Sequence, residues 1–229
     1  MTLLITIVPS IIILFYFILS DKFKEPKRTI IEVFLLGVMI TIPAGYLNSR
    51  ILKTFNNGDI INDALVSGFF AGGLTEEILK FLILYFFVLK KKEFNEPMDG
   101  IVYGVAVSLG FATLENLYYV FYYAESFNMT GLEIAQMRAW TAVPMHGLNG
   151  CIMGFYFGLF AFKGDRKFLG YALIIPYIFH GAYNFLVGLE FIYGLGILII
   201  LVIKAFNLHK TFKNIQKEKF VEHEEKKLN

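Results

Sequence analysis

The chain of 229 residues is poor in charged residues, which make up only 17% of it, and it has a single cysteine. One cysteine excludes an internal disulfide, and because Cys151 lies in an apolar run we expect it to be a small packing residue. A net charge of +2 gives no sign of a nucleic-acid partner. Residues 1–20 lack a basic n-region and a small-residue cleavage site, so they predict a retained membrane span rather than a signal peptide.

Apolar residues are abundant instead: 56% of the chain is hydrophobic, with 25 Phe and 13 Tyr. This composition, with a mean hydropathy of +0.59, indicates a polytopic membrane protein without a separate soluble domain. The predicted fold is an all-α membrane bundle of about seven transmembrane helices. One domain would cover 1–208, followed by a charged cytoplasmic tail at 209–229. The predicted spans are 1–20, 30–47, 64–89, 98–123, 131–162, 168–187 and 191–206.

Positive charges occur in every second connection between these spans. Lys and Arg are concentrated in 22–28, 90–92, 163–167 and 204–219. The other connections, which include 48–62, carry only Arg50, Lys53 and Arg138 as cations, and we expect Arg138 to be an interface anchor. The positive-inside rule then places the N-terminus outside and the C-terminus inside.

Four predicted spans carry ionisable groups, each of which costs at least a few kcal/mol in a bilayer. Counting about 1.5 Å per residue from the inner charged boundary puts four of these groups about 20 to 25 Å deep. They are Glu76, Glu115, His146 and His180. Their depths agree within about 6 Å, one helical turn, so we expect them on one level in the outer half of the bilayer.

Small residues recur at four-residue spacing on the faces that carry these groups, which is typical of close helix packing. The stripes are Gly72 before Glu76, Gly73 before Glu77, Gly100, Gly104, Ser108 and Ala112 before Glu115, Gly150, Gly154 and Gly158 after His146, and Pro176, His180, Asn184 and Gly188. The polar side chains are therefore predicted to point into the bundle.

Each polar residue also has a purely structural explanation. Glu76 and Lys80, at i, i+4 spacing, could form a buried pair that only locks helices together. A lone intramembrane histidine, or Asn116 and Asn184, could be interhelical hydrogen-bonding groups. The combination of acids and imidazoles on one level favours a reaction centre instead.

Four motifs in this order resemble the PrsW family of bacterial intramembrane proteases, which is similar in turn to the CAAX prenyl proteases and to the multi-pass scaffold subunit of γ-secretase. The similarity covers about 64–188. The motifs are Glu76-Glu77-x-x-Lys80, Gly110-Phe111-x-x-x-Glu115-Asn116-x-x-Tyr119, His146, and His180-x-x-x-Asn184.

The resemblance implies a multi-pass protease of the bacterial cytoplasmic membrane. Its implied substrate is a single-span membrane protein, an anti-sigma factor, in which it would make the first (site-1) cut of a stress response. The scaffold relative shows that proteolysis does not follow from the fold alone. At the positions that match the family's motifs, the resemblance implies these site residues: first Glu76, Glu77 and His180, then Glu115, His146, Asn116 and Asn184.

Peptide hydrolysis needs an activated water, an acid for the leaving amine and compensation of the oxyanion charge. Adjacent helical residues diverge by about 100°, so Glu76 and Glu77 cannot face one point equally. We expect one to act as general base and the other to orient it. Glu77 is the preferred base, because Lys80 can hold Glu76 at i+4.

Two mechanisms remain open. In the first, Zn2+ is held by His146, His180 and a carboxylate such as Glu115, with a fourth position for water. In the second there is no metal, and the histidines with Asn184 stabilise the oxyanion while glutamate drives water attack. The sequence lacks His-Glu-x-x-His, so no local motif requires a metal.

Two other functions must be weighed against a protease. A proton or divalent-cation transporter also uses intramembrane Glu and His, but it is expected to have polar groups through both leaflets. Here the inner halves of key spans, such as 83–89 and 152–162, are mostly apolar. A non-catalytic scaffold would bind another protein's transmembrane helix through the glycine faces, and alanine at Glu76 or His180 would spare its function.

Overall fold

The computed structural model describes residues 1–228, with side chains described up to residue 218, and no strand occurs in this part of the chain. Two segments are π-helical, η1 and η3, and two are 3-10 helices, η2 and η4. The elements are α1 (Thr2–Ser20), α2 (Lys27–Phe55), α3 (Ile60–Leu65), η1 (Val66–Glu76), α4 (Glu77–Phe86), η2 (Val88–Lys90), α5 (Pro97–Tyr118), η3 (Tyr119–Tyr123), η4 (Ala124–Phe127), α6 (Gly131–Trp140), α7 (Ala142–Lys163), α8 (Lys167–Leu189) and α9 (Phe191–Leu228).

The all-α membrane bundle predicted from composition is confirmed. Six helices of the described chain are long and apolar enough to cross a membrane, and they correspond to six of the seven expected spans. The remaining expected span, 64–89, is built from four consecutive segments, α3, η1, α4 and η2. Helix α6 begins with a capping box, in which Thr130 and Glu133 are hydrogen-bonded reciprocally. The orientation of the chain in the membrane, with the N-terminus outside and the C-terminus inside, stays a prediction.

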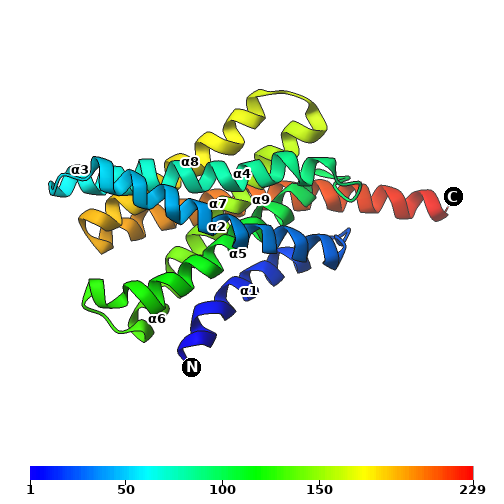
Figure 1. The fold of residues 1–229 in the computed structure, drawn as a ribbon. Coiled ribbons are helices and arrows are strands. Elements are labelled where there is room, and N and C mark those ends of the chain that lie inside the picture. The colour runs from blue at the N-terminus through cyan, green and yellow to red at the C-terminus, as the bar shows by residue number, and fades with distance from the viewer. Residues whose placement is uncertain (229) are drawn as a thin grey trace.

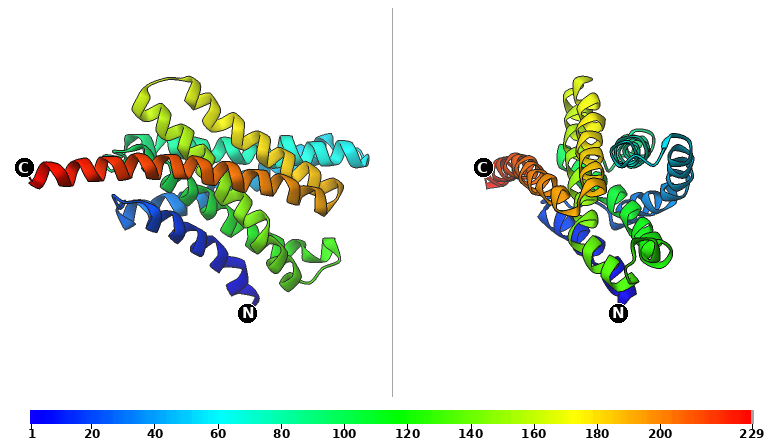
Figure 2. Two further views of the ribbon diagram at one scale, coloured as in Figure 1. Left: turned by 180° about the vertical axis from the view of Figure 1, so that it is seen from behind. Right: turned by 90° about the vertical axis from the view of Figure 1, so that its left-hand side faces the viewer.

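Helix α5 lies in the centre of the bundle (Figure 1). In an apolar stretch of 18 residues in this helix, 89% of the residues are buried. The corresponding share is 22% for α1 and α9 and 28% for α2 and α8. The peripheral helices expose large apolar side chains, such as Leu35 and Ile199, that suit a lipid surround. Seen end-on, α9 lies on one side of α7 and α8, and α2 with η1 and α4 lies on the other (Figure 2).

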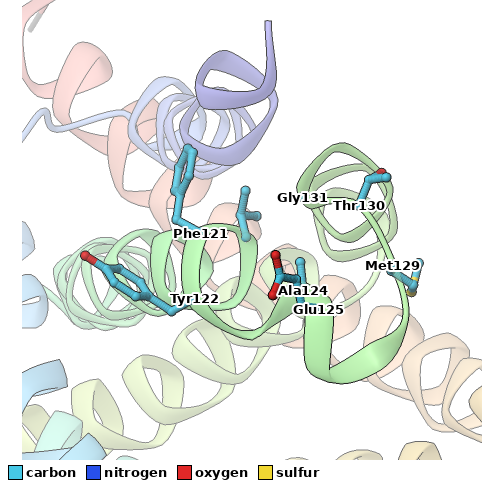
Figure 3. A pocket seen from close by; sticks show the side chains of 8 residues that line it. Phe121, Tyr122, Ala124, Glu125, Met129, Thr130 and Gly131 are labelled. Carbon is cyan, nitrogen blue, oxygen red and sulfur yellow. The ribbon is translucent and has the colours of Figure 1, made fainter.

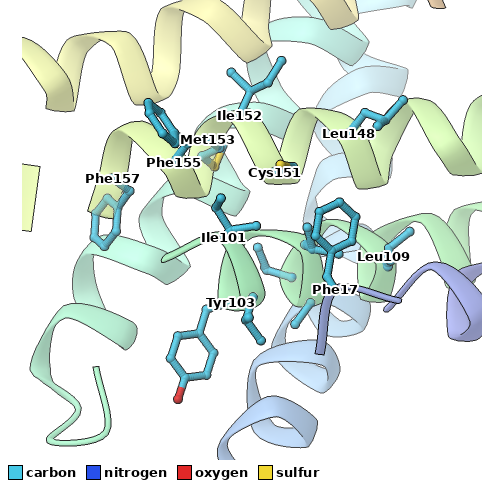
Figure 4. Close-up of a cluster of buried hydrophobic side chains, with 14 of the residues drawn as sticks. Phe17, Ile101, Tyr103, Leu109, Leu148, Cys151, Ile152, Met153, Phe155 and Phe157 are labelled. Atoms are coloured by element: carbon cyan, nitrogen blue, oxygen red, sulfur yellow. The ribbon is translucent and has the colours of Figure 1, made fainter. Parts of the chain in front are cut away.

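The predicted small-residue stripes of α5 and α7 face each other. A Cβ on Gly104 would lie 2.9 Å from Cα of Gly154, and one on Gly100 would lie 3.0 Å from the backbone nitrogen of Gly158. The two backbones thus touch, as small residues allow in membranes. Apolar side chains fill the space around this contact, with Cys151 buried among them as a packing residue (Figure 4).

Three boundaries differ from the prediction. Helix α2 continues to Phe55, so the expected polar connection at 48–62 is wrong in its first half, and Asn48 is a helical residue. The expected span 131–162 is interrupted at Thr141, which separates α6 from α7. Helix α9 runs unbroken through the predicted domain boundary at 208/209.

The first part of the predicted tail packs against the bundle. His209 Nε2 lies 2.8 Å from Ser20 Oγ, and the Phe212 ring stacks on Phe155 with centroids 4.2 Å apart. Gln216 is buried as well. This part of α9 is therefore amphipathic: one side carries the charged residues, and the other packs into the core.

Candidate active site

The adjacent residues Glu76 and Glu77 lie where the π-helix η1 passes into α4, and both are buried. Glycines let η1 approach α8 closely: a Cβ on Gly68 would lie 2.7 Å from the carbonyl oxygen of Gly181, and one on Gly73 would lie 3.1 Å from its Cα. A π-turn inserts one residue into the helical ladder and is common at functional sites. Here it precedes the point where two carboxylates turn toward α8.

His180 of α8 lies between these two carboxylates. Its Nδ1 is 2.8 Å from Oε1 of Glu77, and its Nε2 is 3.9 Å from Oε2 of Glu76. The two acids thus face opposite nitrogens of one ring, at unequal distances. Since a carboxylate can only accept, Nδ1 carries a proton and donates to Glu77.

Lys80 is a fully buried cation in the same cluster. Its Nζ is 2.7 Å from Oε1 of Glu77 but 3.9 Å from Oε2 of Glu76, and it lies 4.5 Å from the centre of the Phe111 ring. Lys80 thus lies within ion-pair distance of Glu76, as predicted, but its closer, hydrogen-bonded partner is Glu77 at i+3. The reason for preferring Glu77 as the base no longer applies.

His146 of α7 extends the cluster toward α5. Nζ of Lys80 lies 3.0 Å from its Nδ1, and its Nε2 lies 3.0 Å from Oε2 of Glu115. An ammonium has no acceptor atom, so Nδ1 accepts and Nε2 donates to the carboxylate. The rings of His146 and His180 lie edge to face with centroids 4.9 Å apart.

The expected convergence of four spans is therefore present in the structure. Contacts link the predicted residues in one continuous group, the network, which consists of Glu76, Glu77, Lys80, Glu115, His146 and His180. Their agreement in depth could be predicted because each residue's distance from a charged boundary is read directly from the sequence.

The two predicted asparagines lie beside the network. Asn116 Nδ2 donates to the Thr6 carbonyl of α1 at 2.9 Å, so it ties α1 to α5. Asn184 follows His180 by one turn of α8, and a Cβ on Gly72 would clash with its side-chain amide. Gly72 thus gives Asn184 room near the two acids.

Two polar residues that contact the network, Arg138 and Asn48, were not predicted from the sequence to do so. Arg138, expected as an interface anchor, is buried, with Nη2 2.5 Å from Oε2 of Glu115 and Nε donating to Oδ1 of Asn116 at 2.7 Å. Asn48 of α2 donates to Oε1 of Glu76 at 3.0 Å. It continues the buried face of α2, which includes Thr41 and Ala44, and that spacing could have identified it.

Three donors fit a metal ion by type and spacing. One potential ligand atom each from Glu76, His146 and His180 lies within 4.8 Å of the others, and two nitrogens with one carboxylate suit zinc. Oε2 of Glu76 is buried and finds no hydrogen-bond partner in the described chain, so it is available as a ligand. Nδ1 of His146 would have to exchange Lys80 for the ion. Glu115, the carboxylate predicted for this role, is not in the group and is bonded to Arg138.

A hollow of about 450 Å³ lies at the C-terminal end of α5, where η3 and η4 lead into α6 (Figure 3). It is lined by Val120, Phe121, Tyr122, Ala124, Glu125, Met129, Thr130 and Gly131. None of these residues belongs to the network. The hollow is thus a surface feature separate from the buried acids.

Comparisons with known proteins agree with the geometry. Residues 25–208 match the family described as PrsW family intramembrane metalloprotease. A Protease PrsW of Bacillus subtilis (strain 168) is 39% identical over 184 residues, 79% of this chain and 79% of the relative. That of Geobacillus kaustophilus (strain HTA426) is 37% identical over 183 residues, 79% and 76% of the two chains.

A Protease PrsW of Clostridioides difficile (strain 630) is similar over almost the whole length, with 33% identity over 229 residues, 97% of this chain and 92% of the relative. No solved structure matches the chain at a significant level.

Proposed function

This chain belongs to the PrsW family of intramembrane metalloproteases, and from that premise we propose that it makes the first cut in a membrane-anchored anti-sigma factor. As a protease of a multi-pass membrane family, it acts from within the bilayer of the bacterial cell membrane. The observation that carries the proposal is the network, which brings acids and imidazoles of separate helices together among apolar walls. Its depth, with the predicted orientation, puts the cut near the outer leaflet.

Glu76 is the residue to which we assign the reactive carboxylate. Its Oε1 is held by Asn48, while its Oε2 is buried without a hydrogen-bond partner among the described residues. A buried carboxylate oxygen that is free to accept is suited to take a proton from water. His180 Nε2 lies beside that oxygen and can position the same water.

Glu77 and Lys80 position the reactive groups. Oε1 of Glu77 accepts from both Nδ1 of His180 and Nζ of Lys80, so it fixes the orientation of that imidazole. A carboxylate behind a histidine is the usual way of setting its tautomer and ring plane. At the other side Arg138 and Glu115 hold His146 in the same manner.

A zinc ion would be held by Glu76, His146 and His180, whose donor atoms fit it by type and spacing. When bound, it would supply Lewis acidity that polarises the scissile carbonyl and activates water. Oε2 of Glu76 cannot hold the ion and accept a proton at the same time. The metal dependence of cleavage distinguishes these two roles of Glu76, metal ligand and general base.

The test is cleavage by the purified protein in liposomes that contain candidate single-span anti-sigma factors, with fragments identified by mass spectrometry. We expect one cut near the outer end of the substrate span. The Glu76→Gln and His180→Ala variants should give no fragment. Cleavage that persists in both variants would contradict the assignment of this network as the active site.

Metal dependence is read in the same assay. We expect a membrane-permeant chelator to abolish cleavage and added Zn2+ to restore it, with about one zinc per chain in the active protein. If cleavage survives complete metal removal, the glutamate mechanism without metal is the correct one. The network remains the active site in either case.

A further inference from the structure

A second buried group of carboxylates lies at the opposite end of α5. Asp21 follows α1, Glu25 lies in the loop before α2, and Asp99 is in the first turn of α5. All three are buried, and one carboxylate oxygen of each lies within 4.8 Å of those of the others. We name these three residues the acidic cluster. Asp99 precedes Glu115 by about 24 Å along the helix, so the cluster is separate from the active site.

Hydrogen bonds fix each aspartate through one oxygen and leave the other unpartnered. Oδ2 of Asp99 accepts from the backbone nitrogens of Asn95 and Glu96, both at 2.8 Å. Oδ1 of Asp21 accepts from Nε2 of Gln216 at 2.7 Å. Oδ1 of Asp99 and Oδ2 of Asp21 are buried and have no hydrogen-bond partner in the part of the chain that the structure describes. Buried polar atoms normally have a partner, and an atom without one in the protein calls for another, such as a water molecule or an ion.

Among the described residues no lysine or arginine is ion-paired with any of the three carboxylates of the cluster. Lys24 lies beside Asp21, but its Nζ donates to backbone carbonyls, those of Asp21, Ile18 and Leu19, and to no carboxylate. Burial accordingly raises the pKa of Asp21 and of Glu25.

We propose that Asp21, Glu25 and Asp99 bind a hard divalent cation such as Ca2+, Mn2+ or Mg2+. Carboxylate oxygens are the ligands that these ions prefer, and the absence of nitrogen and sulfur donors in the set disfavours zinc. Oxygens on opposite sides of Ca2+ lie about 5 Å apart, so the present spacing accommodates the ion without backbone movement.

Such an ion would join three parts of the chain that are distant in sequence. The ligands come from the loop between α1 and α2 and from the start of α5, and Gln216 links Asp21 to α9. The hydroxyl of Tyr103 contacts Glu25 from within α5. Occupation of the cluster would therefore hold the part of α9 around Gln216 against the bundle, on the side predicted to face the cytoplasm.

The experiment uses the full-length protein in detergent, freed of metal with a chelator. Ca2+, Mn2+ and Mg2+ are titrated separately while thermal unfolding is followed. We expect at least one of them to raise the unfolding temperature by roughly 5 °C at saturation. The Glu25→Gln and Asp21→Asn variants should lose this response, while Asp165→Asn, an exposed acid on the same predicted side, should keep it.

Two further measurements guard against variants that fold poorly. Terbium, which replaces Ca2+, should luminesce in the native chain when tyrosine is excited, and Tyr103→Phe should weaken the signal. The response should also persist in Glu76→Gln, because that residue belongs to the other site. No response of the native chain to any ion, or a full response in Glu25→Gln and Asp21→Asn, would overturn the proposal.

Discussion

The two ends of α5 each hold buried carboxylates, but the charges around them differ. At the predicted outer end every acid of the network contacts a histidine, a lysine or an arginine, as Glu77 does with His180 and Lys80. At the predicted inner end Asp21, Glu25 and Asp99 contact amides and a tyrosine hydroxyl. A mixed set of acids and imidazoles can move protons and hold zinc, whereas an all-oxygen set can only attract a hard cation.

The strongest test of this difference is Glu76→Gln, which removes the free carboxylate oxygen of the network while keeping the side chain's shape. We expect cleavage to fall about 10²- to 10⁴-fold, the range for loss of an acid or base group. The measurement is fragment formation in liposomes. Glu125→Gln, an exposed acid at the same end of α5, is the matched control and should cleave normally.

The second largest effect is expected from the buried ion pair of Lys80 and Glu77, which has no counterpart in the acidic cluster. Lys80→Met leaves the buried Glu77 without its lysine partner, so we expect a loss of about 3 to 5 kcal/mol in the free energy of unfolding. The double variant Glu77→Gln with Lys80→Met should recover most of that stability. It should still cleave about 10- to 100-fold more slowly, because His180 loses the carboxylate behind it.

Denaturant unfolding and cleavage rates on the same samples check this prediction. Lys90→Met, an exposed lysine at the inner end of this segment, is the control for loss of a cation. If the double variant cleaved at the native rate, Glu77 and Lys80 would be a structural pair only, the role that the sequence allowed for Glu76 and Lys80.

A smaller effect is expected for Asn48→Ala, which removes the hydrogen bond to Oε1 of Glu76. One such bond contributes about 1 to 1.5 kcal/mol, so the cleavage rate should fall about 5- to 10-fold. Ser49→Ala, the next residue on α2, is the control, since it points about 100° away around the helix. Equal rates for the two variants would show that Asn48 has no part in holding the reactive acid.

The fold and the convergence of the site residues could be predicted because both depend on local features of the sequence. Apolar runs have the length of a bilayer, and each polar residue has a countable distance from a charged boundary. The glycine stripes of α5 and α7 also followed from spacing, since only small residues permit that approach.

Which polar side chains of the network contact each other could not be predicted from the sequence. Residues i+3 and i+4 are equally within reach on a helix, so spacing alone could not tell that Lys80 lies closer to Glu77 than to Glu76. The π-helix η1 depends on its packing against α8, and the contact of Arg138 with Glu115 depends on the break before α7. Asp21, Glu25 and Asp99 look like ordinary surface acids in the sequence, because two lie in a charged loop far from the third.

The smallest expected effect on cleavage is that of Glu25→Gln, and it is the one that separates the two ends of α5 most directly. If the acidic cluster holds a cation that supports only the inner end, this variant should cleave within about 2-fold of the native rate under saturating cation, since no bond of the network is touched. Its thermal stability should nevertheless stop responding to the cation. A fall in cleavage as large as that of Glu76→Gln would mean that the two clusters are coupled through α5 and act as one site.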